Sequence, residues 1–324
     1  MNKSLGKSEG YWGRRGSFCL IKDLNCALAS QEVLQDMLGR QEDRVLKAVT
    51  GLEGGVVASG STCGVVTGGA LGLALMYDDD DLQKKGITAE AGVMSLVGEY
   101  IKWFEDNYGS SLCRERSGIN FYTAGGQLRY LLPGDRVGKC LWHIGGAMKH
   151  LYGYQKKDLS EIDVAPKVEQ REPIHCAQAV LKGIKNRTGI GDPLLERLSF
   201  IFDGGLGYKG GVCGALVGAI AGLNLVLGMN IRDSNYFKTI KAFVVGHVNL
   251  LIDKPFGTPE PFCVGKNIVK KFEEKAGALE CCAITDKKFS GWTNFQKYIL
   301  SSDKCAGLIE LATMESSNAI KSLI

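Results

Sequence analysis

Cysteine is the residue type in this chain best suited to chemistry, and its positions recur in two copies. Cys26 recurs as Cys176 and Cys63 as Cys213, each 150 positions further along the chain. A repeat of this length predicts two copies of one folding unit. The same offset relates a set of glycines: Gly54-Gly55 to Gly204-Gly205, Gly60 to Gly210, Gly64 to Gly214, Gly68 to Gly218 and Gly72 to Gly222.

Each copy carries four cysteines in the same order. They are Cys26, Cys63, Cys113 and Cys140 in the first copy, and Cys176, Cys213, Cys281 and Cys305 in the second. Four thiolates hold both iron–sulfur clusters and structural zinc, so the count indicates a metal site in each copy. Cys282 adjoins Cys281 and could replace it, or the two could perform thiol–disulfide exchange. Cys19 and Cys263 lie outside the pattern and are interpreted as small buried hydrophobes.

A glycine-rich segment precedes the second cysteine of each copy, GGVVASGSTCGVVTG at 54–68 and GGLGYKGGVCGALVG at 204–218. We expect each segment to be a loop leading into a helix whose first turn carries Cys63 or Cys213. The helix dipole and the free backbone N–H groups there would lower the pKa of both thiols. The glycines would let a bulky anion such as an iron–sulfur cluster lie against the backbone. The candidate cofactor-binding glycines are Gly60, Gly64, Gly210 and Gly214.

Composition limits the class of protein. Hydrophobic residues make up 45% and charged residues 23% of the 324 residues, which is typical of a soluble globular protein. The net charge of +4 is too small to indicate nucleic-acid binding. The polar segment 1–16 lacks the apolar core of a signal peptide, so we expect a cytoplasmic protein. Stable disulfides are rare in the cytoplasm, which favours metal ligands or reactive thiols for the eleven cysteines.

The apolar segment 212–229 is the strongest candidate for a membrane span, but Asn224 and several glycines interrupt it. Gly214, Gly218 and Gly222 recur every four residues and would line one helix face, which predicts a tight buried helix pair. We therefore expect no membrane span. The four histidines, His143, His150, His175 and His247, lack a zinc-enzyme pattern and are interpreted as structural.

Helical periodicity dominates the ordered segments. The apolar positions between 93 and 104 follow i, i+3, i+4 spacing before Gly109, and those between 268 and 276 do so before Gly277. We predict an all-α protein of two homologous helical domains, residues 1–160 and 161–324, joined by a polar linker at 159–173. The halves would be related by a pseudo-twofold axis, with the glycine-faced helices near the centre.

The order of these motifs resembles the C-GCAxxG-C-C family of redox-active proteins. The second copy fits well with Cys213-Gly214-Ala215 through Gly218, whereas the first has Val65 in place of alanine. Members occur largely in anaerobic bacteria and archaea, and the resemblance implies a redox-active cysteine site. A similar domain in split-Soret cytochromes looks like an iron–sulfur carrier. By that analogy the four cysteines of each copy, with Cys281 or Cys282 as third ligand of the second, would ligate one cluster.

Three functions are compatible with these residues. The favoured one is electron transfer through an iron–sulfur cluster in each half, 2Fe-2S in preference to 4Fe-4S. The second is a metal-free thiol–disulfide oxidoreductase, which requires a low thiol pKa at both Cys63 and Cys213. The third is a structural zinc protein, in which the cysteines only hold helices together. Whether the protein is an enzyme, which redox protein is its partner and whether it forms a homodimer stay open.

Overall fold

The computed structural model describes residues 7–78, 87–131, 135–157, 159, 173–252 and 257–324. Over these residues the chain consists of helices and connecting loops without a β-strand, so the all-α prediction is confirmed. The predicted linker at 159–173 falls almost wholly outside the described residues. The domain limits 1–160 and 161–324 therefore stay predictions.

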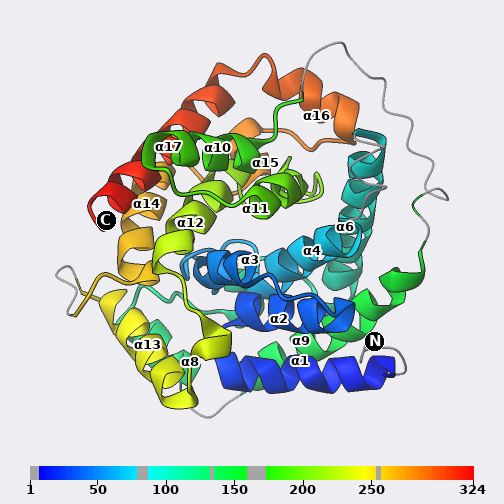
Figure 1. Cartoon of the computed structure of the whole chain (residues 1–324), viewed down its shortest axis with the longest axis vertical. Helices are drawn as coiled ribbons and strands as arrows, with labels where there is room; N and C mark the ends of the chain where they lie inside the picture. Colours follow the sequence, from blue (N-terminus) through cyan, green and yellow to red (C-terminus); the bar gives the residue numbers. More distant parts are fainter. Residues whose placement is uncertain (1–6, 79–86, 132–134, 158, 160–172, 253–256) are drawn as a thin grey trace.

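The helices of the two halves follow the same order along the chain (Figure 1). The first half contains α1 (Glu9–Asp23), α2 (Cys26–Leu38), α3 (Asp43–Ala48), the 3-10 helix η1 (Val49–Leu52), α4 (Gly64–Met76), α6 (Ile87–Tyr108), α7 (Cys113–Ser117), α8 (Ala124–Leu131), α9 (Asp135–Tyr152) and η2 (Gly153–Lys156). The second half contains α10 (Cys176–Thr188), α11 (Pro193–Leu198), η4 (Ser199–Phe202), α12 (Gly214–Leu227), η5 (Ile231–Asp233), α13 (Tyr236–Asn249), α14 (Pro261–Ala276), α15 (Cys281–Thr285), α16 (Trp292–Ile299) and α17 (Asp303–Lys321).

Helix α2 therefore corresponds to α10, α4 to α12, α7 to α15 and α9 to α17. Helices α1 and α13 have no counterpart among the described residues of the other half. Helix α13 belongs to the second half by sequence, yet it lies beside α1 of the first half (Figure 1).

The helix ends follow from local chemistry. The side chain of Asn25 accepts hydrogen bonds from the N–H groups of Ala27 and Leu28, at 3.1 and 3.0 Å, and so starts α2. Gly109 ends α6 and Gly277 ends α14, with φ of +87° and +82°, in the left-handed region that favours glycine. Both helix ends were predicted from the sequence.

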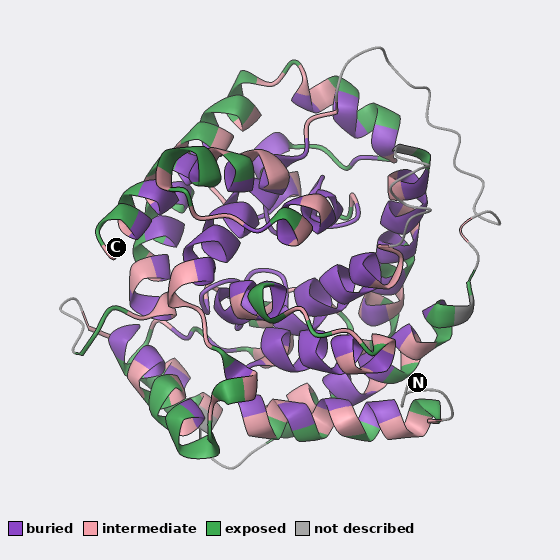
Figure 2. Cartoon of the chain, in the orientation of Figure 1, coloured by how far each residue is buried: buried purple, intermediate pink, exposed green. Residues whose placement is uncertain are grey.

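The glycine-faced helices α4 and α12 are buried and form close helix pairs within their own halves (Figure 2). A Cβ at Gly68 would lie 2.7 Å from the carbonyl oxygen of Ala27 in α2. A Cβ at Gly218 would lie 2.7 Å from the carbonyl oxygen of Ala177 in α10. The tight pair predicted for the second half is thus present in both. The pseudo-twofold relation of the halves stays a prediction.

The two halves contact each other through the loops that precede Cys63 and Cys213. The backbone N–H of Val212 donates to the hydroxyl of Thr62 at 2.8 Å. The guanidinium of Arg114 pairs with the carboxylate of Glu280 at 2.7 Å. One hydrophobic core contains buried residues of both halves.

One helical segment, Gly214–Asp233, is long and apolar enough to cross a membrane by length and composition. Of its most apolar window, 72% is buried inside the protein, as in a core helix. The structure therefore gives no clear membrane span among the described residues.

Candidate metal centres

The four repeated cysteines of each half lie around one enclosed pocket. In the first half they are Cys26 at the start of α2, Cys63 just before α4, Cys113 at the start of α7 and Cys140 in α9; we call this set the first centre. In the second half they are Cys176, Cys213, Cys281 and Cys305 from the corresponding helices, which we call the second centre. The cavities measure about 40 and about 10 Å³. All eleven cysteines of the chain are free thiols.

A short backbone pairing positions two cysteines of the first centre. The N–H of Cys63 donates to the carbonyl of Ser111, and the N–H of Cys113 donates to the carbonyl of Ser61, both at 2.8 Å. These bonds join the glycine-rich loop to the start of α7. Gly60, with φ of +84°, permits this approach, because a Cβ there would lie 2.8 Å from the Cβ of Arg114.

The same pairing recurs in the second half. The N–H of Cys213 donates to the carbonyl of Leu279 at 2.8 Å, and the N–H of Cys281 donates to the carbonyl of Gly211 at 2.7 Å. Gly210, with φ of +78°, approaches the Cβ of Cys282 in the way that Gly60 approaches Arg114. The backbone of the two centres is therefore built alike.

These equivalent backbone hydrogen bonds show that Cys281 and Cys282 have different positions relative to the pocket. Cys281 occupies the place of Cys113 and lines the second pocket. Cys282 occupies the place of Arg114, against Gly210, and is not part of the pocket lining. The sequence left both residues open as the third cysteine, and the geometry favours Cys281.

The four candidate glycines divide into two kinds. Gly214 lines the second pocket, and Gly64 lies against the first, because a Cβ at Gly64 would overlap the Sγ of Cys26. Gly60 and Gly210 instead face α7 and α15 and are absent from the lining of either pocket. Only the first kind lies close enough to restrict what the pockets hold.

The thiols of the first centre differ strongly in acidity. A hydrogen bond from Cys26 and the charge of Arg116 lower the pKa of Cys63 to about 5, against the opposing effect of burial. The same hydrogen bond and burial raise the pKa of Cys26 well above its ordinary value. The first centre therefore contains one thiolate beside one thiol.

Cys213 does not share this acidity. Burial raises the pKa of Cys213 to about 11, although backbone N–H groups of Ala215 and Leu216 favour the thiolate. The prediction of a low pKa at both helix-start cysteines is thus confirmed for Cys63 and wrong for Cys213. The physical reason is desolvation, which outweighs the helix terminus where no cation lies nearby. Cys63 and Cys213 also lie one residue before the first helical turn rather than within it.

Arg116 in α7 is the functional residue that the sequence did not single out. It lines the first pocket, and its guanidinium hydrogen-bonds to Cys63, lies 4.8 Å above the ring of Phe104 and contacts Nδ1 of His143. Burial and Arg116 lower the pKa of His143 to about 3, so the ring is neutral and accepts this contact. His143, interpreted from the sequence as structural, thus lines the first pocket. The available signal was a difference between the copies, since Ile284 occupies the place of Arg116.

Each centre also has one buried carboxyl, Glu53 in the first and Asp203 in the second, at equivalent positions. Burial raises the pKa of Glu53 to about 8. Asp203 accepts hydrogen bonds from Nδ1 of His175 at 2.8 Å and from the N–H of Cys176 at 3.0 Å. The carboxyls are thus a shared feature, whereas Arg116 belongs to the first centre alone.

The sulfur spacing tests which metal group fits. Zinc in a tetrathiolate site holds sulfurs about 3.8 Å apart, from its bond length of about 2.3 Å and tetrahedral geometry. Groups of three or more His, Cys, Asp or Glu residues whose ligand atoms all lie within 4.8 Å of one another could hold one metal ion. Among the described residues, Cys19, Asp23 and Glu32 are the only such group. The sulfurs of both centres are therefore spread more widely than one ion requires.

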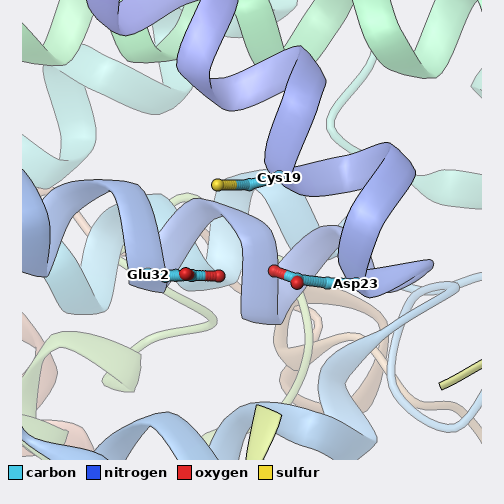
Figure 3. Close-up of side chains that lie close together, drawn as sticks. All are labelled: Cys19, Asp23 and Glu32. Carbon is cyan, nitrogen blue, oxygen red and sulfur yellow. The ribbon is translucent and has the colours of Figure 1, made fainter. Parts of the chain in front are cut away.

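Cys19, Asp23 and Glu32 form a separate buried group between α1 and α2, with the two carboxyls facing each other (Figure 3). The ammonium of Lys22 lies 2.6 Å from Glu32 and 3.2 Å from Asp23. A side chain of the protein thus already supplies the positive charge here. Cys19 is fully buried, as the sequence predicted for a small hydrophobe.

A buried donor without a partner points to an anion in the first centre. The Nε of Arg116 is buried and has no hydrogen-bond partner in the protein. Such a donor costs about 1–3 kcal/mol if it stays unsatisfied. Sulfide and thiolate sulfurs of a cluster accept hydrogen bonds of this kind, so the donor set of the first pocket fits that group.

Comparison with known proteins gives one family. The family model "Putative redox-active protein (C_GCAxxG_C_C)" matches twice, at residues 24–149 and 174–316, which together cover well over half of the chain. The double match is consistent with a tandem duplication. Searches of curated proteins and of solved structures give no match.

Proposed function

Because the chain belongs to the redox-active C_GCAxxG_C_C family, we propose that it transfers electrons through an iron–sulfur cluster held by four cysteines in each half. The observation that carries this proposal is the convergence of four thiols, from four separate helices, on one enclosed pocket in both halves. Their spread exceeds that of a single ion, which disfavours the structural zinc alternative. The preference for 2Fe-2S over 4Fe-4S stays a prediction.

In this proposal each cluster supplies one-electron chemistry, and the protein sets its surroundings. Cys26, Cys63, Cys113 and Cys140 would hold the first cluster, and Cys176, Cys213, Cys281 and Cys305 the second. Arg116 donates to Cys63 and offers its free Nε–H to the first pocket. Phe289 and Phe295 close the second pocket and exclude water. A cytoplasmic location and a redox-protein partner stay predictions.

Anaerobic purification followed by iron and acid-labile sulfide analysis tests the proposal. We expect two clusters per chain, with visible charge-transfer bands and an EPR signal after reduction by dithionite. A Cys113→Ser, Cys281→Ser double variant should lose most of the iron, whereas Cys19→Ser, with a buried cysteine outside both centres, should keep it. Protein that stays free of iron and sulfide after anaerobic reconstitution would overturn the proposal.

A metal-free thiol–disulfide oxidoreductase is the second candidate, favoured by the hydrogen-bonded pair of Cys63 and Cys26 and by the low pKa of Cys63. The Cys63 thiolate would attack a substrate disulfide and displace one thiolate. Cys26 would then lose its proton, attack the mixed disulfide and release the second thiol, leaving a Cys26–Cys63 disulfide. Fast alkylation of Cys63 by iodoacetamide at pH 6 in iron-free protein supports this function. Alkylation no faster than that of Cys213 excludes it.

A further inference from the structure

The two centres share a backbone but differ in charge. Arg116, Arg136 and Lys139 line the first pocket, and no charged side chain lines the second. Arg136 and Lys139 pair with Asp135, whereas Arg116 hydrogen-bonds to Cys63. The start of α7 and the start of α15 make equivalent hydrogen bonds to the glycine-rich loops, which aligns Cys113 with Cys281. Three residues later this alignment places Arg116 in the first centre and Ile284 in the second. A guanidinium in one pocket is thus replaced by an alkyl group in the other.

Arg116 acts directly on the first centre. It hydrogen-bonds to Cys63, and its charge lies close enough to act on Cys113 and Cys140 as well. Its contact with the neutral His143 leaves the positive charge uncompensated by a carboxylate there. The buried carboxyls do not cancel this difference. Glu53 lines the first pocket, and burial raises its pKa to about 8, whereas Asp203 lies outside the lining of the second pocket and is paired with His175.

The surroundings of the two centres add to the difference. Cys176, Cys213 and Cys281 are buried, with 7–9% of their surface exposed, and Phe295 closes the pocket at 2%. In the first centre only Cys63 is buried, at 4%, and the other three cysteines are half-buried, whereas in the second centre only Cys305 is half-buried. Charge added to the second centre is therefore solvated less well than charge added to the first.

We propose that Arg116 gives the first centre the higher reduction potential, so that it is the electron acceptor of the pair. The proposal rests on the iron–sulfur function. A cluster held by four thiolates is an anion, and reduction adds one more negative charge. A nearby cation and an N–H donor to sulfur stabilise the reduced form more than the oxidised form, which raises the potential. An apolar, buried pocket acts in the opposite direction.

The direction of electron flow follows. A one-electron donor such as dithionite, which is used in the test, would give an electron to a cluster in the second centre. The first centre, at higher potential, would then take up that electron. One cluster loses the electron that the other gains, and no proton is required. The loops that precede Cys63 and Cys213 contact each other through Thr62 and Val212, and both of these cysteines belong to one hydrophobic core.

Potentiometric titration of the anaerobic protein, followed by visible absorption and EPR, tests the proposal. We expect two separate one-electron waves. Cys281→Ser, which removes a ligand of the second centre, should delete the wave at lower potential. Arg116→Gln should lower the remaining wave by at least 59 mV, which is a tenfold change in the equilibrium constant for a one-electron couple. The matched control, Arg114→Gln, changes the same residue type two positions away, outside the pocket, and should shift it by far less.

Arg116→Lys is a control for misfolding, because it keeps the positive charge. The reduction potential of the first centre in this variant should stay close to the wild-type value. Wild-type protein with full iron whose centres titrate together would overturn this proposal alone. An equal shift in Arg116→Gln and Arg114→Gln, with iron content unchanged, would do the same. Protein without iron would overturn the proposed function and this inference together, and iron analysis tells the cases apart.

Discussion

Replacing Gly64 by alanine should disable the first centre and leave the second intact. Gly64 is the first residue of α4, where this helix meets the start of α2. An added Cβ would overlap the Sγ of Cys26. It would also lie 3.1 Å from the backbone nitrogen of Ala27 and 3.2 Å from the carbonyl oxygen of Leu52.

The magnitude follows from these contacts. Nonbonded heavy atoms settle about 3.5–4.0 Å apart, so the Cys26 sulfur must move by on the order of 1 Å. The backbone atoms of Ala27 and Leu52 cannot swing aside as a side-chain end can. Overpacking of this kind costs about 1–3 kcal/mol of unfolding free energy. A shift of about 1 Å also exceeds the tolerance of about 0.5 Å for a positioned ligand.

Iron content and urea denaturation of the anaerobically reconstituted variant measure both effects. We expect Gly64→Ala to bind about half of the wild-type iron and to unfold at lower urea. Gly138→Ala in α9 is the matched control, since no atom lies within 4 Å of a Cβ built there. Within a helix it should keep all the iron and gain about 0.5–1 kcal/mol. Full iron content and unchanged stability in Gly64→Ala would refute the reasoning.

Three further predictions test other parts of the structure. Gly214→Ala places a Cβ 2.9 Å from a backbone carbonyl oxygen and should remove the iron of the second centre only; equal loss from both centres would contradict this. Cys282→Ser should keep wild-type iron while Cys281→Ser loses about half, and the reverse result would reassign the ligand. Burial and the neighbouring Glu32 raise the pKa of Asp23 to about 8, against about 4 when unfolded, so the folded chain binds the extra proton between these values. Unfolding free energy should therefore fall as the pH rises from about 4 to 8, and Asp23→Asn should flatten that fall in urea titrations; an unchanged slope would contradict it.

The sequence predicted those features that repeat. The constant offset of Cys26 and Cys176 correctly indicated two copies, and helical spacing before Gly109 and Gly277 correctly predicted where α6 and α14 end. These features depend on local geometry and on residue order, both of which can be read without a structure. The choice of Cys281 over Cys282 could not be made in this way, because adjacent residues differ only in the direction of their side chains.

The acidity of the thiols could not be predicted either, because it depends on what surrounds each one. A cysteine at the start of a helix does not always have a cation or a second thiol beside it. Cys63 has both, in Arg116 and Cys26, whereas Cys213 has neither and is dominated by burial. Arg116 lies 53 positions from Cys63 in the sequence and reaches it only after α7 packs against the glycine-rich loop.

The geometry also explains why the copies agree in some residues and differ in others. Gly64 and Gly68 lie against backbone atoms of Ala27 in α2, and Gly218 lies against those of Ala177 in α10. Gly214 lies against the Cβ of Cys176 and the backbone of Phe202. Any larger residue at these positions would therefore displace a segment that positions a cysteine. In α7 and α15 the shared hydrogen bonds come from the backbone and from the hydroxyls of Ser117 and Thr285, which donate to the carbonyls of Cys113 and Cys281. The side chains of Arg116 and Ile284 are not part of this shared set. A duplicated unit can therefore keep two cysteine centres in place while exchanging Arg116 for Ile284. Differences in behaviour between the two centres should accordingly map to α7 and α15, and to α9, where Arg136 and Lys139 line the first pocket only, rather than to the glycine-rich loops.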